Sequence, residues 1–365
     1  MTTQNWPNWL PLRKNLRELS PYGAPQIPAQ AVMNTNENPY APSLQLTHAI
    51  SDRVREVSLT LNRYPDRDAV VLREKLAAFI NSLSNTSFTT SNIWAANGSN
   101  EIIQSLFMAF GSGTVIGFTP SYSMHPLIAK TTQVQWISGS RRADFSLDVD
   151  SAIDQINVAK PVLTFVTTPN NPTGSSITLE EIAKIAESNP GLLVIDEAYA
   201  EFSDETSAVT LIEKYPHIVV IRTMSKAFAF AGARLGYLVA HPAVIDSMFL
   251  VRLPYHLSAL TQAAAEVALD FSDELLGTVA QIRKARENVA QDLRALGLTV
   301  LPSSANFLLF GGFKTPAADL WQSMLDRGVL IRDVGLLGYL RVTIGNEAEN
   351  KKFIDSLTAC LGVEK

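Results

Sequence analysis

Four short polar segments in the middle of the chain carry the residue types from which an active site can be built. Each follows a run of hydrophobic residues that predicts a buried strand. Ligands of open parallel sheets bind beyond the carboxyl ends of the strands, so side chains that follow neighbouring strands meet there. The succession predicts a single site built from residues 119–122, 167–174, 196–199 and 222–226.

Lys226 is the candidate nucleophile of this set. It follows one hydrophobic run and precedes the apolar stretch 227–232. Burial in such surroundings lowers the pKa of an amine, because the charged form loses its hydration, and a neutral amine forms Schiff bases with carbonyl compounds. The competing interpretation is a surface lysine at a strand end, which fits the same position.

Asp196 ends another hydrophobic run, where a carboxylate must be paired or hydrogen-bonded. A protonated pyridine nitrogen is such a partner, and the carboxylate keeps that ring an electron sink. A helix cap or a structural ion pair would fit equally. Tyr199 is placed to reach the same ligand, or is an ordinary half-buried tyrosine.

A phosphate-binding pattern lies at residues 97–100, before an apolar helix whose free N–H groups suit an anion. Ser225 and Arg234 flank Lys226 and would complete the site, the arginine through a bidentate contact. The alternatives are that Ser99 simply caps the helix and that Arg234 pairs with a surface carboxylate.

The elements that must position these residues alternate along the chain. Helices are predicted at 66–83, 100–110, 123–131 and 178–188, the last with a capping-box pattern at its start. Strands between helices predict an α/β protein with a mostly parallel sheet covered on both faces. The strands are predicted at 93–96, 114–118, 162–166, 192–195 and 218–221.

After residue 257 the pattern changes to a long helical stretch, 258–295, followed by short strands and another helix. We therefore predict a large domain over residues 46–257. A smaller α+β unit would combine an N-terminal arm, 1–45, with residues 258–365, since chain ends often lie together.

Composition excludes several function classes. The 365 residues are 46% hydrophobic and 18% charged, as in ordinary globular proteins, and the net charge of −5 offers no basic patch for nucleic acid. Cys360 is the single cysteine and the histidines lack metal-ligand spacing, so we expect no metal. Neither a signal peptide nor a membrane span is predicted, and the expected location is the cytoplasm.

The spacing of the motifs resembles the fold-type-I pyridoxal-phosphate aminotransferases. Asn-Pro-Thr-Gly at 171–174 is followed by Asp-x-x-Tyr, which begins 25 residues after Asn171, then by Ser-Lys with the lysine 30 residues after Asp196, and then by Arg234. The resemblance covers nearly the whole chain. Within that class, further stretches resemble the histidinol-phosphate aminotransferase family, and they are residues 34–40, 63–66, 96–101 and 222–228.

The resemblance implies a role for each matching residue. Lys226 would hold pyridoxal 5′-phosphate and move the proton between Cα and C4′, while Asp196 would pair with the pyridine nitrogen. Asn171 and Tyr199 would contact the phenolic oxygen, and Tyr122 would stack on the ring. The remaining cofactor-binding residues, most of them around the phosphate, would be Ser99, Asn100, Thr223, Ser225 and Arg234.

The resemblance also implies small-molecule substrates and a homodimer with shared sites, in which Tyr64 reaches the phosphate of the neighbouring subunit. Arg341 and Arg332 would bind the anionic group of the substrate. From position alone, Tyr22 would equally be a turn aromatic, Tyr255 a core residue and Arg332 half of a structural ion pair. The implied substrate-binding set is Tyr22, Asn36, Tyr255, Arg332 and Arg341.

The implied reaction interconverts L-histidinol phosphate plus 2-oxoglutarate and imidazole-acetol phosphate plus L-glutamate, in histidine biosynthesis. The nearest alternative is an aromatic amino-acid (phenylalanine) aminotransferase, which shares every cofactor residue. A pyridoxal-phosphate decarboxylase, such as a threonine-phosphate decarboxylase, would use the same scaffold. A nucleotide-binding protein is disfavoured, because the chain has no strand-borne G-x-G-x-x-G and no G-x-x-x-x-G-K-[ST].

Overall fold

A seven-stranded sheet with the order β2-β8-β7-β6-β5-β3-β4 forms the centre of the computed structural model, which describes residues 6–362. Its neighbouring strands pair in parallel, except that β8 is antiparallel to both of its neighbours. The fold is therefore α/β with a mostly parallel sheet, as predicted. The strands are β2 (Ile93–Ala96), β3 (Thr114–Thr119), β4 (Gln135–Ser140), β5 (Leu163–Thr167), β6 (Leu192–Asp196), β7 (Ile218–Thr223) and β8 (Gly236–Val239).

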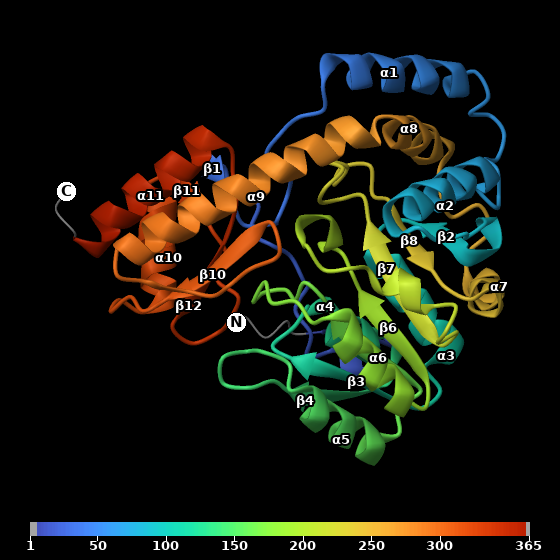
Figure 1. The fold of residues 1–365 in the computed structure, drawn as a ribbon, viewed down its shortest axis with the longest axis horizontal. Helices are drawn as coiled ribbons and strands as arrows, with labels where there is room; N and C mark the ends of the chain where they lie inside the picture. The colour runs from blue at the N-terminus through green and yellow to red at the C-terminus, as the bar shows by residue number, and fades with distance from the viewer. Residues whose placement is uncertain (1–5, 363–365) are drawn as a thin grey trace.

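Helices cover both faces of this sheet (Figure 1). Along β6, Leu193 and Ile195 belong to one hydrophobic cluster and Val194 belongs to the other, as the alternation of side chains across a strand requires. The cluster that contains Val194 is closed by α3 (Ser99–Phe110), α4 (Met124–Thr132) and α7 (Pro242–Val251). Helices on the other face are α2 (Val70–Ser84), α5 (Val149–Ala159) and α6 (Leu179–Ser188).

The C-terminal part of the chain contributes to two smaller sheets, one of which also contains a strand of the N-terminal arm. One is antiparallel, with the order β12-β10-β9, and the other is the parallel pair β1-β11. Because β1 belongs to the N-terminal arm, this pair places the arm beside the C-terminal segment (Figure 1). The strands are β1 (Ala31–Val32), β9 (Thr299–Val300), β10 (Phe307–Gly311), β11 (Val329–Leu330) and β12 (Tyr339–Thr343).

A long helix, α9 (Ser272–Ala295), runs from the side of the large sheet to the C-terminal elements (Figure 1). Helix α1 (Leu44–Ser58) packs against α8 (Ala259–Asp270). The division into a large domain, 46–257, and a smaller unit made of 1–45 and 258–365 stays our proposal. Residues 1–5 and 363–365 of the smaller unit lie outside the part of the chain that the structure describes. The remaining helices are α10 (Ala317–Asp326), α11 (Glu347–Leu361) and the short 3-10 turns η1 (Lys14–Leu16), η2 (Thr90–Asn92), η3 (Ala200–Phe202) and η4 (Ala208–Leu211).

The five predicted strands are confirmed to within one or two residues, and so is the helix predicted at 178–188. Its N-cap, Thr178, accepts a hydrogen bond from the backbone of Glu181, whose carboxylate accepts one from the backbone of Thr178. This reciprocal pair satisfies two N–H groups that the first turn leaves free, which explains where α6 begins.

Two predicted helices differ from the structure. The single helix expected at 258–295 is two helices, because the chain turns at Phe271 (φ −107°, ψ 21°) and the acidic residues that follow begin a new first turn. The helix expected from residue 66 begins at Val70. The carboxylate of Asp66 binds the backbone N–H of Val70, and Ala69 adopts a left-handed φ of 46°.

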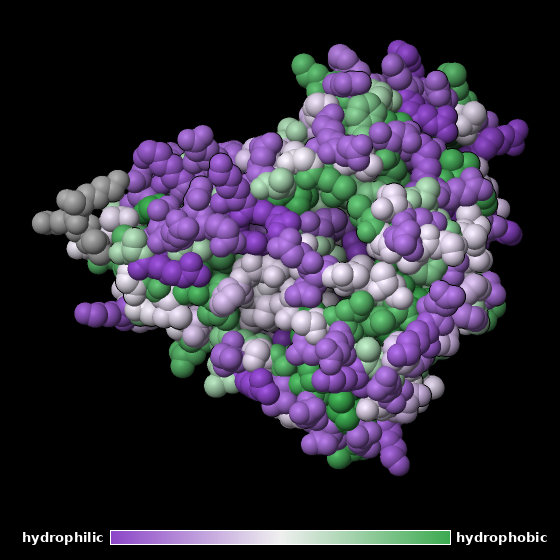
Figure 2. Space-filling view, in the orientation of Figure 1, coloured by the Kyte–Doolittle hydropathy of each residue, from purple (hydrophilic) through white to green (hydrophobic). Residues whose placement is uncertain are grey.

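On the face that Figure 2 shows, hydrophilic side chains cover most of the C-terminal helices and the region around α1. Hydrophobic side chains appear between them in small groups. Within residues 6–362, the helices are all too short or too polar to cross a membrane.

Candidate active site

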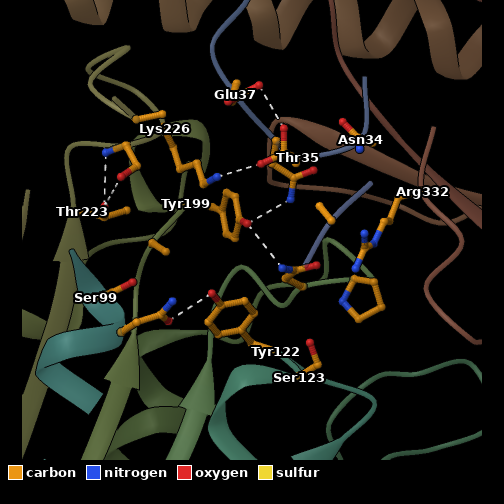
Figure 3. A pocket seen from close by; sticks show the side chains of 18 of the residues that line it. Asn34, Thr35, Glu37, Ser99, Tyr122, Ser123, Tyr199, Thr223, Lys226 and Arg332 are labelled. Atoms are coloured by element: carbon orange, nitrogen blue, oxygen red, sulfur yellow. Dashed lines mark hydrogen bonds between the residues drawn. The ribbon is translucent and has the colours of Figure 1, made fainter. Parts of the chain in front are cut away.

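A cavity of about 670 Å³ opens beyond the carboxyl ends of β5, β6 and β7 and is closed by the N-terminal arm and by residues around β12 (Figure 3). Fourteen of the sixteen residues predicted for the site line it, so the four polar segments do meet. These residues are Tyr22, Asn36, Ser99, Asn100, Tyr122, Asn171, Asp196, Tyr199, Thr223, Ser225, Lys226, Arg234, Arg332 and Arg341.

Lys226 points into the cavity, where its Nζ donates a hydrogen bond to the backbone carbonyl of Thr35, 2.9 Å away (Figure 3). Burial lowers the pKa of this amine to about 8, and the positive charge of Arg341 adds to the effect. A lysine with this pKa is a nucleophile near neutral pH. The interpretation as a surface lysine is therefore wrong.

Asp196 lies at the end of β6 and is almost completely buried. Its Oδ2 accepts a hydrogen bond from Nε2 of His125 at 3.0 Å, and its Oδ1 accepts one from the backbone of Ala198 at 3.2 Å. His125 is equally buried and lies in the first turn of α4. The carboxylate is thus held rigidly at the cavity wall, able to face a cationic group of a ligand.

The N-terminus of α3 forms one end of the cavity. The N-cap of this helix is Gly98, which makes no side-chain capping bond, so Ser99 lies in the first turn and does not cap it. A Cβ on Gly98, whose φ is +82°, would lie 2.8 Å from Nη2 of Arg234. Only glycine therefore lets the guanidinium approach this turn.

Arg234 donates to the carbonyl of Ala231 at 3.0 Å and lies 3.5 Å from Oγ of Ser225. Thr223 orders this corner, since its hydroxyl donates to Ser225 Oγ at 3.0 Å and accepts from the Ser225 backbone. Within the described residues Arg234 makes no ion pair, which leaves its charge for an anion beside the free N–H groups of α3.

Tyr122 forms the wall between the two ends of the cavity. Its hydroxyl donates to Oδ1 of Asn100 at 3.1 Å, and its ring meets the ring of His125 edge-on at 5.4 Å. Burial raises the pKa of Tyr122, so the hydroxyl stays protonated. The wall offers a flat aromatic surface to a ring-shaped ligand.

Arg341 and Arg332 form the opposite end. Their backbones exchange two hydrogen bonds of 2.9 Å across an antiparallel bridge, and both side chains line the cavity. Arg341 is 6% exposed, and burial lowers its pKa to about 10. It donates to Oδ1 of Asn171 at 2.6 Å and to the carbonyl of Asn34 at 2.7 Å, which are neutral acceptors.

Neither arginine forms an ion pair with any residue between 6 and 362, so the structural ion pair considered for Arg332 is wrong. Arg341 also keeps one buried nitrogen, Nε, without a hydrogen-bond partner. Two uncompensated positive charges at the end of a cavity, one of them buried, favour an anionic ligand there.

Tyr199 is buried at the centre of the site, not half-exposed, and its oxygen accepts from Nδ2 of Asn36 at 2.9 Å and from Nδ2 of Asn171 at 3.4 Å. Asn36 lines the cavity, as predicted for a substrate-binding residue. Both polar atoms of its side chain also form hydrogen bonds within the protein, because Oδ1 accepts from Thr343 at 3.0 Å. Its geometry therefore fits a positioning residue.

Tyr64 and Tyr255 do not line this cavity. Their rings stack on each other with centroids 4.3 Å apart, and both are exposed, so Tyr255 is not a core residue. An ion pair between Arg252 and Asp68 holds their two segments together away from the cavity. The expectation that Tyr255 lines the substrate pocket is therefore not met within a single chain.

Two contacts of the site were missed from the sequence. His125 had been considered only as a possible metal ligand, although its place three residues after Tyr122 is a signal that could have linked it to the site. The carbonyl of Thr35 carries no signal, because any residue supplies a carbonyl. Within residues 6–362 no group of three His, Cys, Asp or Glu side chains is arranged to hold a metal ion.

Comparison with known proteins agrees with this geometry. The profile of the family "Aminotransferase class I and II" matches residues 29–357. The histidinol-phosphate aminotransferase of Nocardia farcinica is 55% identical over 348 residues, which cover 94% of this chain and 90% of that protein. The enzyme of the same name from Corynebacterium glutamicum (strain R) is 55% identical over 350 residues, 95% of each chain.

Among solved structures, the histidinol-phosphate aminotransferase of Sinorhizobium meliloti in complex with pyridoxal-5′-phosphate superposes with a TM-score of 0.84. The two chains are 22% identical, and the match covers 96% of this chain and 98% of the other, so this likeness concerns the fold. The matches to the two sequence relatives span at least 90% of each protein, at 55% identity. The chain therefore belongs to the class I and II aminotransferases and, within them, to the histidinol-phosphate aminotransferase family.

Proposed function

We propose that this aminotransferase interconverts L-histidinol phosphate plus 2-oxoglutarate and imidazole-acetol phosphate plus L-glutamate, with pyridoxal 5′-phosphate on Lys226. The observation that carries the proposal is the buried Arg341, which faces the same cavity as Lys226 and pairs with no carboxylate among the described residues. Such a charge suits a substrate with an anionic end and an amino group.

The residues present fit the proposed cofactor. Lys226 is an amine of lowered pKa, Asp196 is a buried carboxylate on the cavity wall, and Tyr122 offers a flat ring between them and the end of α3. That end supplies free backbone N–H groups and the guanidinium of Arg234, as a phosphate requires. When bound, the cofactor supplies an electron sink for the bonds at the substrate Cα.

The protein's own groups then have distinct tasks. Lys226 would hold the cofactor, and as a general base and acid it would move the proton of the substrate Cα. Asp196, fixed by His125, would keep the pyridine nitrogen of the cofactor protonated. Arg341 and Arg332 orient the substrate by its anionic end, so that the Cα proton faces the lysine.

Two substrates with different anions must use the same arginine pair. Glutamate carries a carboxylate where histidinol phosphate carries a phosphate, and a guanidinium binds either group through two parallel hydrogen bonds. Arg332 is less buried than Arg341, which leaves room at this end for anions of different size.

The decisive experiment is a substrate panel in the half-reaction that starts from the pyridoxamine form. We expect kcat/KM for imidazole-acetol phosphate to exceed that for phenylpyruvate, the keto acid of phenylalanine, by at least about 100-fold, because a phosphate offers the Arg341–Arg332 pair more charge-assisted contacts than a carboxylate does. Equal values would favour an aromatic amino-acid aminotransferase, and release of carbon dioxide would favour a decarboxylase.

The lowered pKa of Lys226 predicts how the apoprotein takes up its cofactor. An amine with a pKa of about 8 is mostly neutral above that pH, so the rate of imine formation with pyridoxal phosphate should rise with pH, with its midpoint near pH 8, and level off about one unit higher. Stopped-flow absorbance measures this rate, with Lys226→Ala as the blank. A rate that keeps rising toward pH 10.5, the value of an ordinary lysine, would contradict the assignment.

We further propose a homodimer in which Tyr64 serves the partner's site. The support is a group of exposed hydrophobic side chains around the stacked Tyr64–Tyr255 pair, which lies outside the cavity of its own chain. The segments at 59–68 and 250–255 are joined by the Arg252–Asp68 ion pair. Their exposed hydrophobic residues are Leu59, Leu61, Tyr64, Leu250, Leu253 and Tyr255.

Mixing two inactive variants tests this arrangement. Tyr64→Ala and Lys226→Ala subunits, unfolded together and refolded, should regain about one quarter of the wild-type activity, since half of the dimers are mixed and each has one intact site. The readout is transaminase activity per subunit after refolding. No recovery above the sum of the separate variants would mean that Tyr64 acts within its own chain.

The proposed reaction converts small polar metabolites, and the one cysteine, Cys360, is unpaired. Both features support a cytoplasmic location, where thiols stay reduced.

A further inference from the structure

We propose that Thr343 and Asn36 are positioning residues that fix the direction of the Tyr199 hydroxyl proton. They form a hydrogen-bonded chain which starts at the backbone of the arm and ends at the cavity. This inference rests on the proposed function, because the acceptor that Tyr199 addresses is the phenolic oxygen of the cofactor.

The chain starts from a donor whose direction is certain. The backbone N–H of Asn36 donates to Oγ1 of Thr343 at 2.9 Å, and an N–H group cannot accept. The hydroxyl proton of Thr343 is therefore left for the Asn36 side-chain oxygen Oδ1, 3.0 Å away. Thr343 is 4% exposed, so with the Asn36 amide reversed this proton would lose its acceptor in a buried place.

The orientation of the Asn36 amide decides the next bond. With Oδ1 on Thr343, Nδ2 faces Tyr199 and donates to its oxygen at 2.9 Å (Figure 3). Asn171 is oriented in the same way, because Arg341 can only donate and binds Oδ1 of Asn171 at 2.6 Å. Nδ2 of Asn171 consequently also faces Tyr199, at 3.4 Å.

The side-chain amides of Asn36 and Asn171 thus both donate to the Tyr199 oxygen, which accepts through its lone pairs. Tyr199 is 5% exposed, and its remaining hydrogen-bonding atom is its own proton, which must point to an acceptor in the cavity. Burial raises the pKa of Tyr199, so this proton is present at neutral pH. The geometry makes Tyr199 a donor to the ligand before the ligand arrives.

The backbone at Asn36 is held in a specific conformation. Its φ is +56°, in the left-handed region that few residue types other than glycine and asparagine adopt. The carbonyl of Asn36 accepts from Nδ2 of Asn306 at 3.0 Å, and Asn36 is 1% exposed. Bonds to β12 and to residue 306 hold the conformation, which links the arm and the C-terminal sheet to the centre of the site.

A hydrogen bond from Tyr199 has a measurable effect on the bound cofactor. It draws negative charge from the phenolic oxygen, so the neighbouring nitrogen that joins Lys226 to the cofactor holds its proton less tightly. Losing the bond raises the pH at which that proton leaves, and this pH is seen as the midpoint of a change in visible absorption.

The test uses Thr343→Val, which keeps the shape of the side chain and removes the hydroxyl. The holoenzyme midpoint should rise by about 0.5 to 1 pH unit, because the Asn36 amide is freed to reverse. Tyr199→Phe should raise it at least as far, and the double variant should match Tyr199→Phe alone, as expected for residues that act in one chain. Thr343→Ala serves as the second hydroxyl-free variant if the valine variant does not fold.

Thr343→Ser is the matched control, since it restores the hydroxyl and should keep the wild-type midpoint. A purely structural role would lower the melting temperature of Thr343→Val without moving the midpoint, and that result would overturn the inference. A shift in the double variant equal to the sum of both single shifts would overturn it as well. If the wild-type protein bound no cofactor, the proposed function itself would fail, which is a different outcome from an unmoved midpoint.

Discussion

Lys226→Ala is expected to lower kcat for transamination by about 10⁴-fold or more, because one substitution removes both the attachment point of the cofactor and the base that moves the Cα proton. The variant should bind pyridoxal phosphate without forming an imine, so borohydride should fix no cofactor on the protein. Steady-state kinetics and mass spectrometry after borohydride treatment measure the two effects.

The fold should survive this change. Folding lowers the pKa of Lys226 to about 8 from 10.5, so the unfolded chain binds more protons between these pH values, and the stability of the wild-type apoprotein should rise with pH across that window. Below pH 8 the charged amine is buried at a cost, and alanine removes that cost. The melting temperature of the variant at pH 7 should therefore equal or exceed that of the wild type.

A matched lysine separates a site effect from a general one. Lys184 is exposed on α6, where it pairs with Glu180, and it does not line the cavity. Lys184→Ala should keep wild-type activity. Turnover by Lys226→Ala at the wild-type rate would mean that another group performs the chemistry.

Arg341→Ala should reduce kcat/KM for both phosphorylated and carboxylate substrates by on the order of 100-fold to 1,000-fold. The affinity for pyridoxal phosphate should change far less, since Arg341 binds Asn171 and the Asn34 carbonyl, whereas the proposed phosphate site is beside Arg234. Initial-rate kinetics give the first quantity, and equilibrium dialysis of the apoprotein with the cofactor gives the second.

Arg341→Lys is the informative control for this prediction. It keeps the positive charge but loses the planar fork, whose two terminal nitrogens bind Asn171 and the Asn34 carbonyl separately. We expect it to recover only part of the lost kcat/KM. Equal losses of substrate and cofactor binding in the alanine variant would show that Arg341 supports the cavity as a whole.

Much of the large sheet was predictable because local patterns dominate there. The strand at 192–196 is a short run of hydrophobic residues buried on both faces, and its terminal Asp196 is the polar exception that marks a site. Fixed spacing between such strand ends then places Asn171, Asp196 and Lys226 around one cavity, and the structure brings them together.

Strand β8 was not predicted, although it is an interior strand of the sheet, between β2 and β7. Gly236 begins it, and a Cβ there would lie 2.6 Å from the backbone of Ser99. The glycine is needed for a contact with a turn far away in sequence, whereas locally it weakens the strand pattern. The low β-strand propensity of glycine therefore argues locally against the strand that the structure has at 236–239.

Contacts between distant segments were the other limit. The bond from Lys226 to Thr35 spans 191 residues, and the bond between Asn36 and Thr343 spans 307. Such pairs depend on the packing of the arm against the C-terminal sheet, which no local pattern encodes. The exposure of Tyr255 was not predictable either, because a single sequence does not show whether an aromatic side chain packs in the core or lies on the surface.

The parallel pairing of β1 with β11 has a consequence for how the enzyme matures in the cell. The cavity needs residues 34–37 and Arg341, so its walls cannot close before the segment that carries Arg341 has been synthesised and has packed against the arm. We therefore expect stable binding of the cofactor only after the C-terminal sheet has formed around β1.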